Sequence, residues 1–202
     1  GWITTGDSIM INITNKDKPT YSYEDSKVSS DEHPKPNVTP STAPTIKAVS
    51  LSKTSCTYDG KVKNPTIKVY NTEGKQLSSK YYTVSKPSGR KNVGKYKYTI
   101  TFKNGYTGKK TLYFTINPKP TKLTSLKKGS KRFTAKWKKV SAQASGYQIR
   151  YSMKSSMAKS KILTVKNYKT TSKKITRLKK KKKYYVQIRT YKTVSKAKYY
   201  SG

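Results

Sequence analysis

Short runs in which every second residue is apolar recur along the chain from Ile46 onward. The clearest run ends at Phe102, where Tyr96, Tyr98, Ile100 and Phe102 alternate with lysine or threonine. This alternation places the apolar side chains on one face of a β-strand. Turn-forming residues separate the runs at intervals of about 8–12 residues, and no helical period competes. We therefore predict an all-β chain with two tandem immunoglobulin-like β-sandwiches after an extended N-terminal linker.

The first 45 residues have a different composition from the rest of the chain. Residues 1–14 contain one alternating run, with Ile9, Ile11 and Ile13 on one face, and we expect it to be the C-terminal strand of an upstream domain. Residues 15–45 are rich in Pro, Ser and Thr and have no apolar period. Such a composition predicts an extended, semi-rigid linker.

Residues 46–118 carry a set of turn and strand motifs: Tyr58-Asp59-Gly60, Pro65, Asn92-Val93-Gly94-Lys95-Tyr96, Gly105-Tyr106-Thr107-Gly108 and Phe114-Thr115-Ile116. Together they resemble the bacterial immunoglobulin-like repeats of Gram-positive surface proteins. The resemblance implies a β-sandwich outside the cell, with Tyr58, Asp59 and Gly60 as structural residues. Asn104-Gly105 independently predicts a hairpin turn in the same segment.

Residues 119–202 show a second series of alternating strands, in which Trp137, Tyr147, Leu178 and Tyr184 hold characteristic positions. These four residues resemble the structural residues of a fibronectin type III domain, with Tyr151 as an alternative to Tyr147 for the central-strand tyrosine. Leu178 with Tyr184 resembles the tyrosine corner of sandwich folds. Where that family often has proline and glycine before the tyrosine, this chain has Lys179–Lys183. The final strand is just developing at Tyr199–Gly202, so we expect part of it to be missing.

Charge is divided unevenly along the sequence. The first 45 residues have four lysines and six acids, whereas the remainder has 42 lysines and arginines and only two acids, Asp59 and Glu73. The body of the chain therefore has a formal charge of +40, which attracts polyanions. Lysine outnumbers arginine 41 to 5, a ratio that favours salt-sensitive, unspecific attraction over sequence-specific reading of nucleic acid.

The densest basic cluster predicts a polyanion-binding patch in the loop before Tyr184. It comprises Lys179, Lys180, Lys181, Lys182 and Lys183 with Lys173 and Lys174, and we expect Lys127, Lys128, Lys131, Lys138 and Lys139 to extend it. Tyr185, Tyr191, Tyr199 and Tyr200 are candidates for stacking on sugars or bases if they are exposed. The lysine content is equally consistent with protection of sheet edges and solubility, or with the codon bias of an AT-rich genome, and both alternatives stay open.

The body of the chain lacks the residues that catalysis or metal binding would need. Gly6-Asp7-Ser8-Ile9 resembles the nucleophile block of Gly-Asp-Ser-Leu esterases, but the only histidine, His33, lies in the linker, so a turn before a strand explains it better. Asp59 and Glu73 adjoin turn glycines, which argues against a glycosidase pair. The single cysteine, Cys56, allows no internal disulfide, and we expect it to pack as a small apolar residue.

We therefore expect a non-catalytic spacer or accessory module of a secreted or surface-anchored bacterial protein. No cofactor, no membrane span and a monomeric state are predicted, and an anionic cell-wall polymer is the favoured partner, with nucleic acid disfavoured. One alternative is an adhesin module that binds glycan or host matrix through tyrosines such as Tyr185 or Tyr191. Another is the accessory tail of an upstream secreted enzyme.

Overall fold

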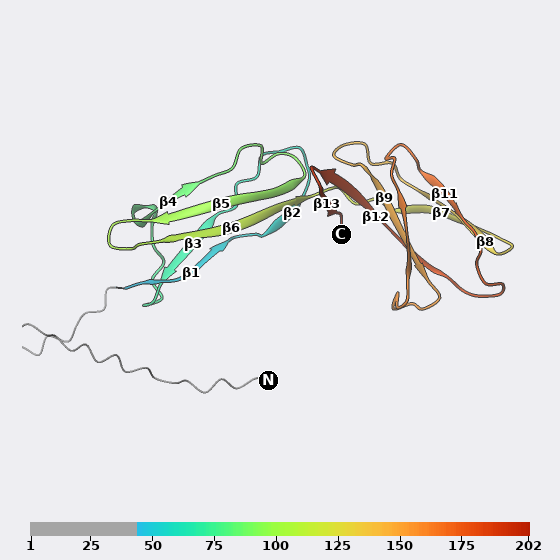
Figure 1. Ribbon diagram of the computed structural model, residues 1–202, viewed down its shortest axis with the longest axis horizontal. Helices are drawn as coiled ribbons and strands as arrows, with labels where there is room; N and C mark the ends of the chain where they lie inside the picture. Colours follow the sequence, from blue (N-terminus) through green and yellow to red (C-terminus); the bar gives the residue numbers. More distant parts are fainter. Residues whose placement is uncertain (1–43) are drawn as a thin grey trace, which may run out of the picture. The chain divides into compact units, whose positions relative to one another are not determined.

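The computed structural model describes residues 44–202. The strand expected in residues 1–14, most of the predicted linker, the Ser8 motif and His33 lie outside the described residues. Within residues 44–202, no helix is long and apolar enough to cross a membrane. The described chain forms two tandem β-sandwiches, drawn in blue to green and in yellow to red in Figure 1, and the predicted fold class is confirmed.

The first sandwich combines a two-stranded and a four-stranded sheet. β1 pairs with β3, and the larger sheet has the order β2-β6-β5-β4, with β2 parallel to β6. A short 3₁₀ turn, η1 (Ser79–Tyr81), precedes β4. The strands are β1 (Ile46–Leu51), β2 (Ser55–Thr57), β3 (Ile67–Asn71), β4 (Tyr82–Ser85), β5 (Gly94–Phe102) and β6 (Lys109–Asn117).

The alternating run that dominates the sequence forms the centre of this core. Tyr98 and Ile100 are 1% and 0% exposed, while Lys97 and the other outward residues of β5 are more exposed. The following hairpin turns at Asn104 and Gly105, which both have positive φ values of 53° and 93°. This is the backbone of a type I′ turn, and it explains why the predicted Asn-Gly pair is suited to this position.

The second sandwich contains a three-stranded and a four-stranded sheet, with the orders β11-β8-β7 and β10-β9-β12-β13. Its strands are β7 (Leu123–Gly129), β8 (Arg132–Trp137), β9 (Gly146–Ser152), β10 (Lys161–Val165), β11 (Ser172–Ile175), β12 (Tyr185–Val194) and β13 (Ala197–Tyr200). β13 pairs with the end of β12 from Tyr191 to Val194, so the expected final strand is present over four residues.

The core of the second sandwich is built from inward residues of both sheets. Phe133, Ala135 and Trp137 come from β8, and Tyr147 and Ile149 come from β9. All five are less than 10% exposed. Because adjacent strand residues point to opposite faces, burial of these alternate positions leaves the intervening polar residues on the two outer faces.

Candidate anion-binding site

The lysine-rich loop between β11 and β12 is held against the tip of the β7–β8 hairpin. Gly129 pairs with Arg132, so Ser130 and Lys131 form the turn, with Lys131 in the left-handed region at φ 50°. The backbone N–H of Leu178 donates a hydrogen bond of 3.0 Å to the carbonyl oxygen of Lys131. The hairpin turn and the lysine loop therefore form one end of the sandwich.

Tyr184 fixes the other side of the loop. Its hydroxyl accepts a 3.0 Å hydrogen bond from the backbone N–H of Lys179, which closes the six-residue segment on itself. Lys181 has a positive φ of 54° within this segment. This conformation interrupts the extended backbone, and all five lysines of the loop, Lys179–Lys183, are exposed.

A cleft of about 460 Å³ lies between the hairpin tip and the lysine loop. Its lining includes seven basic residues and no acid, above apolar side chains that include Phe133, Leu178 and Val186. The basic residues are Lys128, Lys131, Arg132, Lys179, Lys180, Lys181 and Lys182. A low-polarity wall beside several like charges strengthens the local field, so this cleft is the strongest candidate for anion binding among the described residues.

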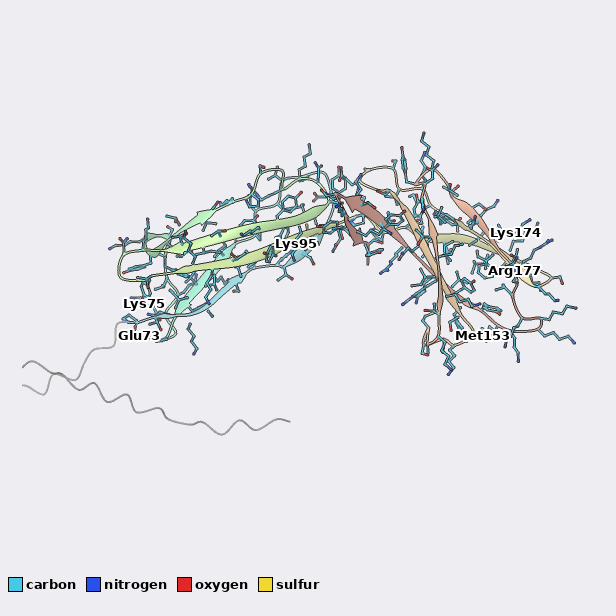
Figure 2. All side chains as sticks on the ribbon, viewed as in Figure 1. Glu73, Lys75, Lys95, Met153, Lys174 and Arg177 are labelled. Atoms are coloured by element: carbon cyan, nitrogen blue, oxygen red, sulfur yellow. The ribbon has the colours of Figure 1, made fainter. Side chains whose placement is uncertain are left out.

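The predicted basic patch is thus only partly brought together. Lys179–Lys182, Lys128 and Lys131 line the cleft, whereas Lys183 places its Nζ 5.1 Å from the centre of the Tyr185 ring. Lys173 and Lys174 are exposed on β11, outside the cleft lining; Lys174 is labelled in Figure 2 with Arg177, which follows the strand. Lys127 is exposed on β7. Lys138 and Lys139 line a different cavity beside Pro120.

One candidate stacking tyrosine is corrected by the structure. Tyr191 is only 4% exposed and its ring lies 6.4 Å from that of Tyr200, so it is not available to stack on a ligand. A side chain at Gly146 would lie 3.0 Å from the Tyr191 ring, so the absence of one gives that ring its space. Tyr185, Tyr199 and Tyr200 are half-buried.

Three of the four predicted structural residues of the second sandwich, Trp137, Tyr147 and Leu178, belong to its core, whereas Tyr184 is half-buried beside the lysine loop. The rings of Trp137 and Tyr147 meet edge to face at a centroid distance of 5.3 Å. The Tyr147 hydroxyl accepts a 2.9 Å hydrogen bond from the Val140 N–H and donates a 2.8 Å bond to the Tyr168 carbonyl. Leu178 packs against the same core.

The Tyr58-Asp59-Gly60 segment forms a turn after β2. Tyr58 packs against the first core, and Gly60 has a φ of 82°, a conformation that favours glycine. The Asp59 carboxylate accepts hydrogen bonds from the Lys61 N–H and from the Lys63 ammonium. These bonds, the one from Lys63 foremost, hold the pKa of Asp59 below its ordinary value, which suits a structural turn acid.

The remaining reactive groups also have structural settings. Glu73 accepts a 3.1 Å hydrogen bond from the Asn71 amide. Cys56 is half-buried on β2, and desolvation raises the pKa of its thiol, which makes a thiolate nucleophile less accessible. Within residues 44–202, no three His, Cys, Asp or Glu side chains are grouped so that they could hold a metal ion.

Sequence reasoning missed a second polar cluster on the outer face of the β10-β9-β12-β13 sheet. The tripeptide Gln-Ile-Arg occurs twice, at residues 148–150 and 187–189, and the two copies pair antiparallel. Arg150 therefore faces Gln187, and Arg189 faces Gln148. The repeated tripeptide could have revealed this cluster from the sequence, since in both strands its polar residues alternate with an isoleucine that packs in the core and fall on the outward side.

Comparison with known proteins finds one family match, and it lies in the second sandwich. Residues 118–201 match the fibronectin type III domain. Among solved structures, the FN1-FN3 domains of chicken CNTN1 share 16% identity at a TM-score of 0.36, covering 73% of this chain and 62% of that one. A two-domain fibronectin type III segment of chicken tenascin shares 16% identity at a TM-score of 0.40, covering 77% and 97%. The chain thus spans less than two thirds of the CNTN1 segment. No curated protein matches the chain.

Proposed function

We propose that the chain is a non-catalytic extracellular spacer or accessory module that is retained on an anionic polymer. The starting point is the match of residues 118–201 to the fibronectin type III domain. The family supports the first half of this proposal, since its domains are modules typical of extracellular proteins. The resemblance of residues 46–118 to Gram-positive surface repeats supports a bacterial surface or secreted location.

The observation that carries the proposed attachment is the basic cleft between the β7–β8 hairpin and the lysine loop. Seven cationic residues line this cleft, without an acid among the lining residues. In the whole body of the chain, 42 basic residues stand against Asp59 and Glu73, and Asp59 is already paired with Lys63. A cell-wall polymer with one phosphate in each repeat has the opposite charge and the length to contact the cleft and the surrounding lysines together.

Binding to a poly(glycerol phosphate) chain at increasing salt tests this proposal. We expect the affinity to fall steeply with salt, because lysine–phosphate contacts release counterions. Replacing Lys128, Lys131 and Lys180 by glutamine should reduce the slope of log K against log salt by about 2. A matched variant replaces the exposed lysines Lys53, Lys68 and Lys110 by glutamine. It has the same net charge as the cleft variant and should change the slope less.

Two results would contradict the proposal. Retention on purified cell wall that does not fall as salt rises would show that lysine–phosphate attraction is not the cause of binding. Equal effects of the cleft variant and the matched variant would show that the cleft has no special part in attachment, and that only the overall charge matters.

A further inference from the structure

The two Gln-Ile-Arg tripeptides form a nearly symmetric arrangement on the outer face of the second sandwich. The register aligns Gln148 with Arg189, Ile149 with Ile188, and Arg150 with Gln187. Ile149 is fully buried and Ile188 packs against the core. The two isoleucines therefore anchor the strands, while both arginines and both glutamines lie on the opposite, outward face.

Each arginine is oriented by the glutamine across from it. The Nε of Arg150 donates a 2.6 Å hydrogen bond to Gln187 Oε1, and Arg189 donates from Nε and Nη2 to Gln148 Oε1 at 3.0 and 2.7 Å. The Arg189 guanidinium also lies 3.8 Å from the centre of the Tyr200 ring. These contacts hold two planar guanidinium groups in place before any ligand arrives, which lowers the entropic cost of binding.

Both arginines still have N–H groups that can donate to a ligand. The contacts of Arg150 with described residues use only Nε, so its two terminal nitrogens remain as a fork of donors on an exposed side chain. Arg150 pairs with Gln187, and Arg189 lies two residues further along β12, diagonally across from Arg150. Diagonal neighbours of this kind in a sheet are separated by roughly 7–8 Å. Both guanidinium groups can therefore reach one carboxylate placed between them, and bidentate geometry suits that group.

The surroundings of the arginines select the rest of the ligand. A groove of about 310 Å³ is lined by Gln148, Arg150, Ile162, Gln187, Ile188, Arg189, Ser201 and Gly202. Amide side chains both donate and accept hydrogen bonds, as sugar hydroxyls do. Ile162 is 58% exposed and offers an apolar surface for the C–H face of a pyranose ring. A bare phosphate would use neither of these features.

We propose that this outer face, with Arg150 and Arg189 as its charged anchors, is a binding site for an acidic sugar that carries a carboxylate. The site lies on the opposite sheet from the β7–β8 hairpin that forms the basic cleft, and it depends on arginine geometry instead of on the lysine charge. It therefore goes beyond polymer attachment and does not rest on it.

Titration with a tetrasaccharide of alternating glucuronate and N-acetylglucosamine tests the site, with the neutral N-acetylglucosamine tetramer as the control probe. We expect saturable binding of the acidic tetrasaccharide, at least about tenfold tighter than the neutral one. Arg150→Lys and Arg189→Lys keep the charge but lose the planar fork, and each should weaken binding about tenfold. Arg177→Lys, outside this face, is the matched control and should change nothing.

Backbone amide shifts and thermal unfolding are recorded for each variant, and Arg150→Lys, at an exposed position, should leave the fold unchanged. Equal affinity for the acidic and neutral sugars, or full affinity in both lysine variants, would overturn the proposal. Equal binding of a tetra-glutamate peptide would overturn the assignment to sugars. Raising the salt concentration from about 0.15 M to about 0.5 M distinguishes the two sites. Salt screens the attraction of the lysine cleft for anions, whereas bidentate binding at the two arginines should stay detectable.

Discussion

At the scale of single residues, burial without a hydrogen-bond partner distinguishes otherwise similar tyrosines. Tyr98 is 1% exposed and its hydroxyl has no hydrogen-bond partner among residues 44–202, whereas the buried Tyr147 hydroxyl is bonded to Val140 and Tyr168. A buried polar group costs free energy unless it is hydrogen-bonded. The two hydroxyl groups should therefore contribute to stability with opposite sign.

Tyr98→Phe should leave the free energy of unfolding unchanged or raise it by up to about 1 kcal/mol, because it removes an unsatisfied hydroxyl and keeps the ring. Tyr147→Phe is the matched control and should lower it by about 1–3 kcal/mol, since two backbone groups lose their partner. Urea unfolding of each variant measures both values. A clear loss of stability in Tyr98→Phe would show that its hydroxyl is bonded in solution.

Burial of tyrosines also predicts how stability depends on alkaline pH. Desolvation is the main cause that raises the pKa of Tyr96, Tyr98 and Tyr191 above the ordinary value of 10.0. The neutral tyrosines make their full contribution to the free energy of unfolding below pH 10.0. This contribution is lost as the pH rises through the higher pKa values of the folded state. Unfolding midpoints measured from pH 8 upward, with tyrosinate absorbance, should fall only in this alkaline range; an earlier fall would contradict the assignment.

Gly146, at the start of β9, has no room for a side chain. A Cβ atom on Gly146 would stand 2.0 Å from the carbonyl oxygen of Val165. Gly146→Ala should therefore destabilise the second sandwich by at least about 1–3 kcal/mol, which is roughly 4–8 °C in Tm for each kcal/mol. Gly129→Ala, which meets only the flexible Arg132 side chain, is the control and should shift Tm less.

At the scale of elements, the β7–β8 turn and the β11–β12 loop act as one unit. The Leu178 N–H bonds to the hairpin turn, and the Tyr184 hydroxyl accepts from the Lys179 N–H. These two contacts hold lysines from separate parts of the sequence around one cleft. Without them, the like charges of the loop would favour a more open conformation.

Tyr184→Phe removes one of these contacts and should lower stability by about 1 kcal/mol. It should also speed amide hydrogen exchange in residues 179–183, because the loop is no longer closed by the hydroxyl. Tyr185→Phe changes the neighbouring tyrosine, half-buried on β12, and serves as the control. Unchanged exchange in Tyr184→Phe would mean that the loop is held by its other contacts alone.

At the scale of the whole molecule, self-repulsion accompanies the charge of the body. Residues 46–202 have a net charge of +40, and two acids cannot offset it locally. Repulsion of this kind opposes both compaction and association. The same charge that attracts a polyanion should therefore reduce stability at low salt and keep the chain monomeric.

Raising the salt concentration from about 0.02 M to about 0.3 M should increase the free energy of unfolding by about 1 kcal/mol, or roughly 4–8 °C in Tm, because it screens the repulsion. Thermal unfolding measures this shift, and sedimentation should show a monomer throughout. A neutral osmolyte at equal osmolality is the control. A Tm that falls as salt rises would show that attractive ion pairs outweigh the repulsion.

Local pattern was sufficient to predict the β character of residues 46–202, the clearest strand and the turn that follows it. The alternation in Tyr96–Phe102 and the Asn104-Gly105 turn report local backbone preferences, so both could be read directly from neighbouring residues. The charge asymmetry is equally plain in the sequence, and by itself it narrows the candidate functions, because the body has too few acids for carboxylate chemistry.

Only the tertiary structure decided which distant residues share a site. Strand pairing brings Gln148-Ile149-Arg150 against Gln187-Ile188-Arg189, and loop contacts bring Lys131 to Leu178. The burial of Tyr191 likewise depends on Gly146 and Tyr200, which adjoin it only in the folded sheet. The physical reason is that strand identity follows from local periodicity, whereas register and loop packing follow from contacts between segments far apart in the chain.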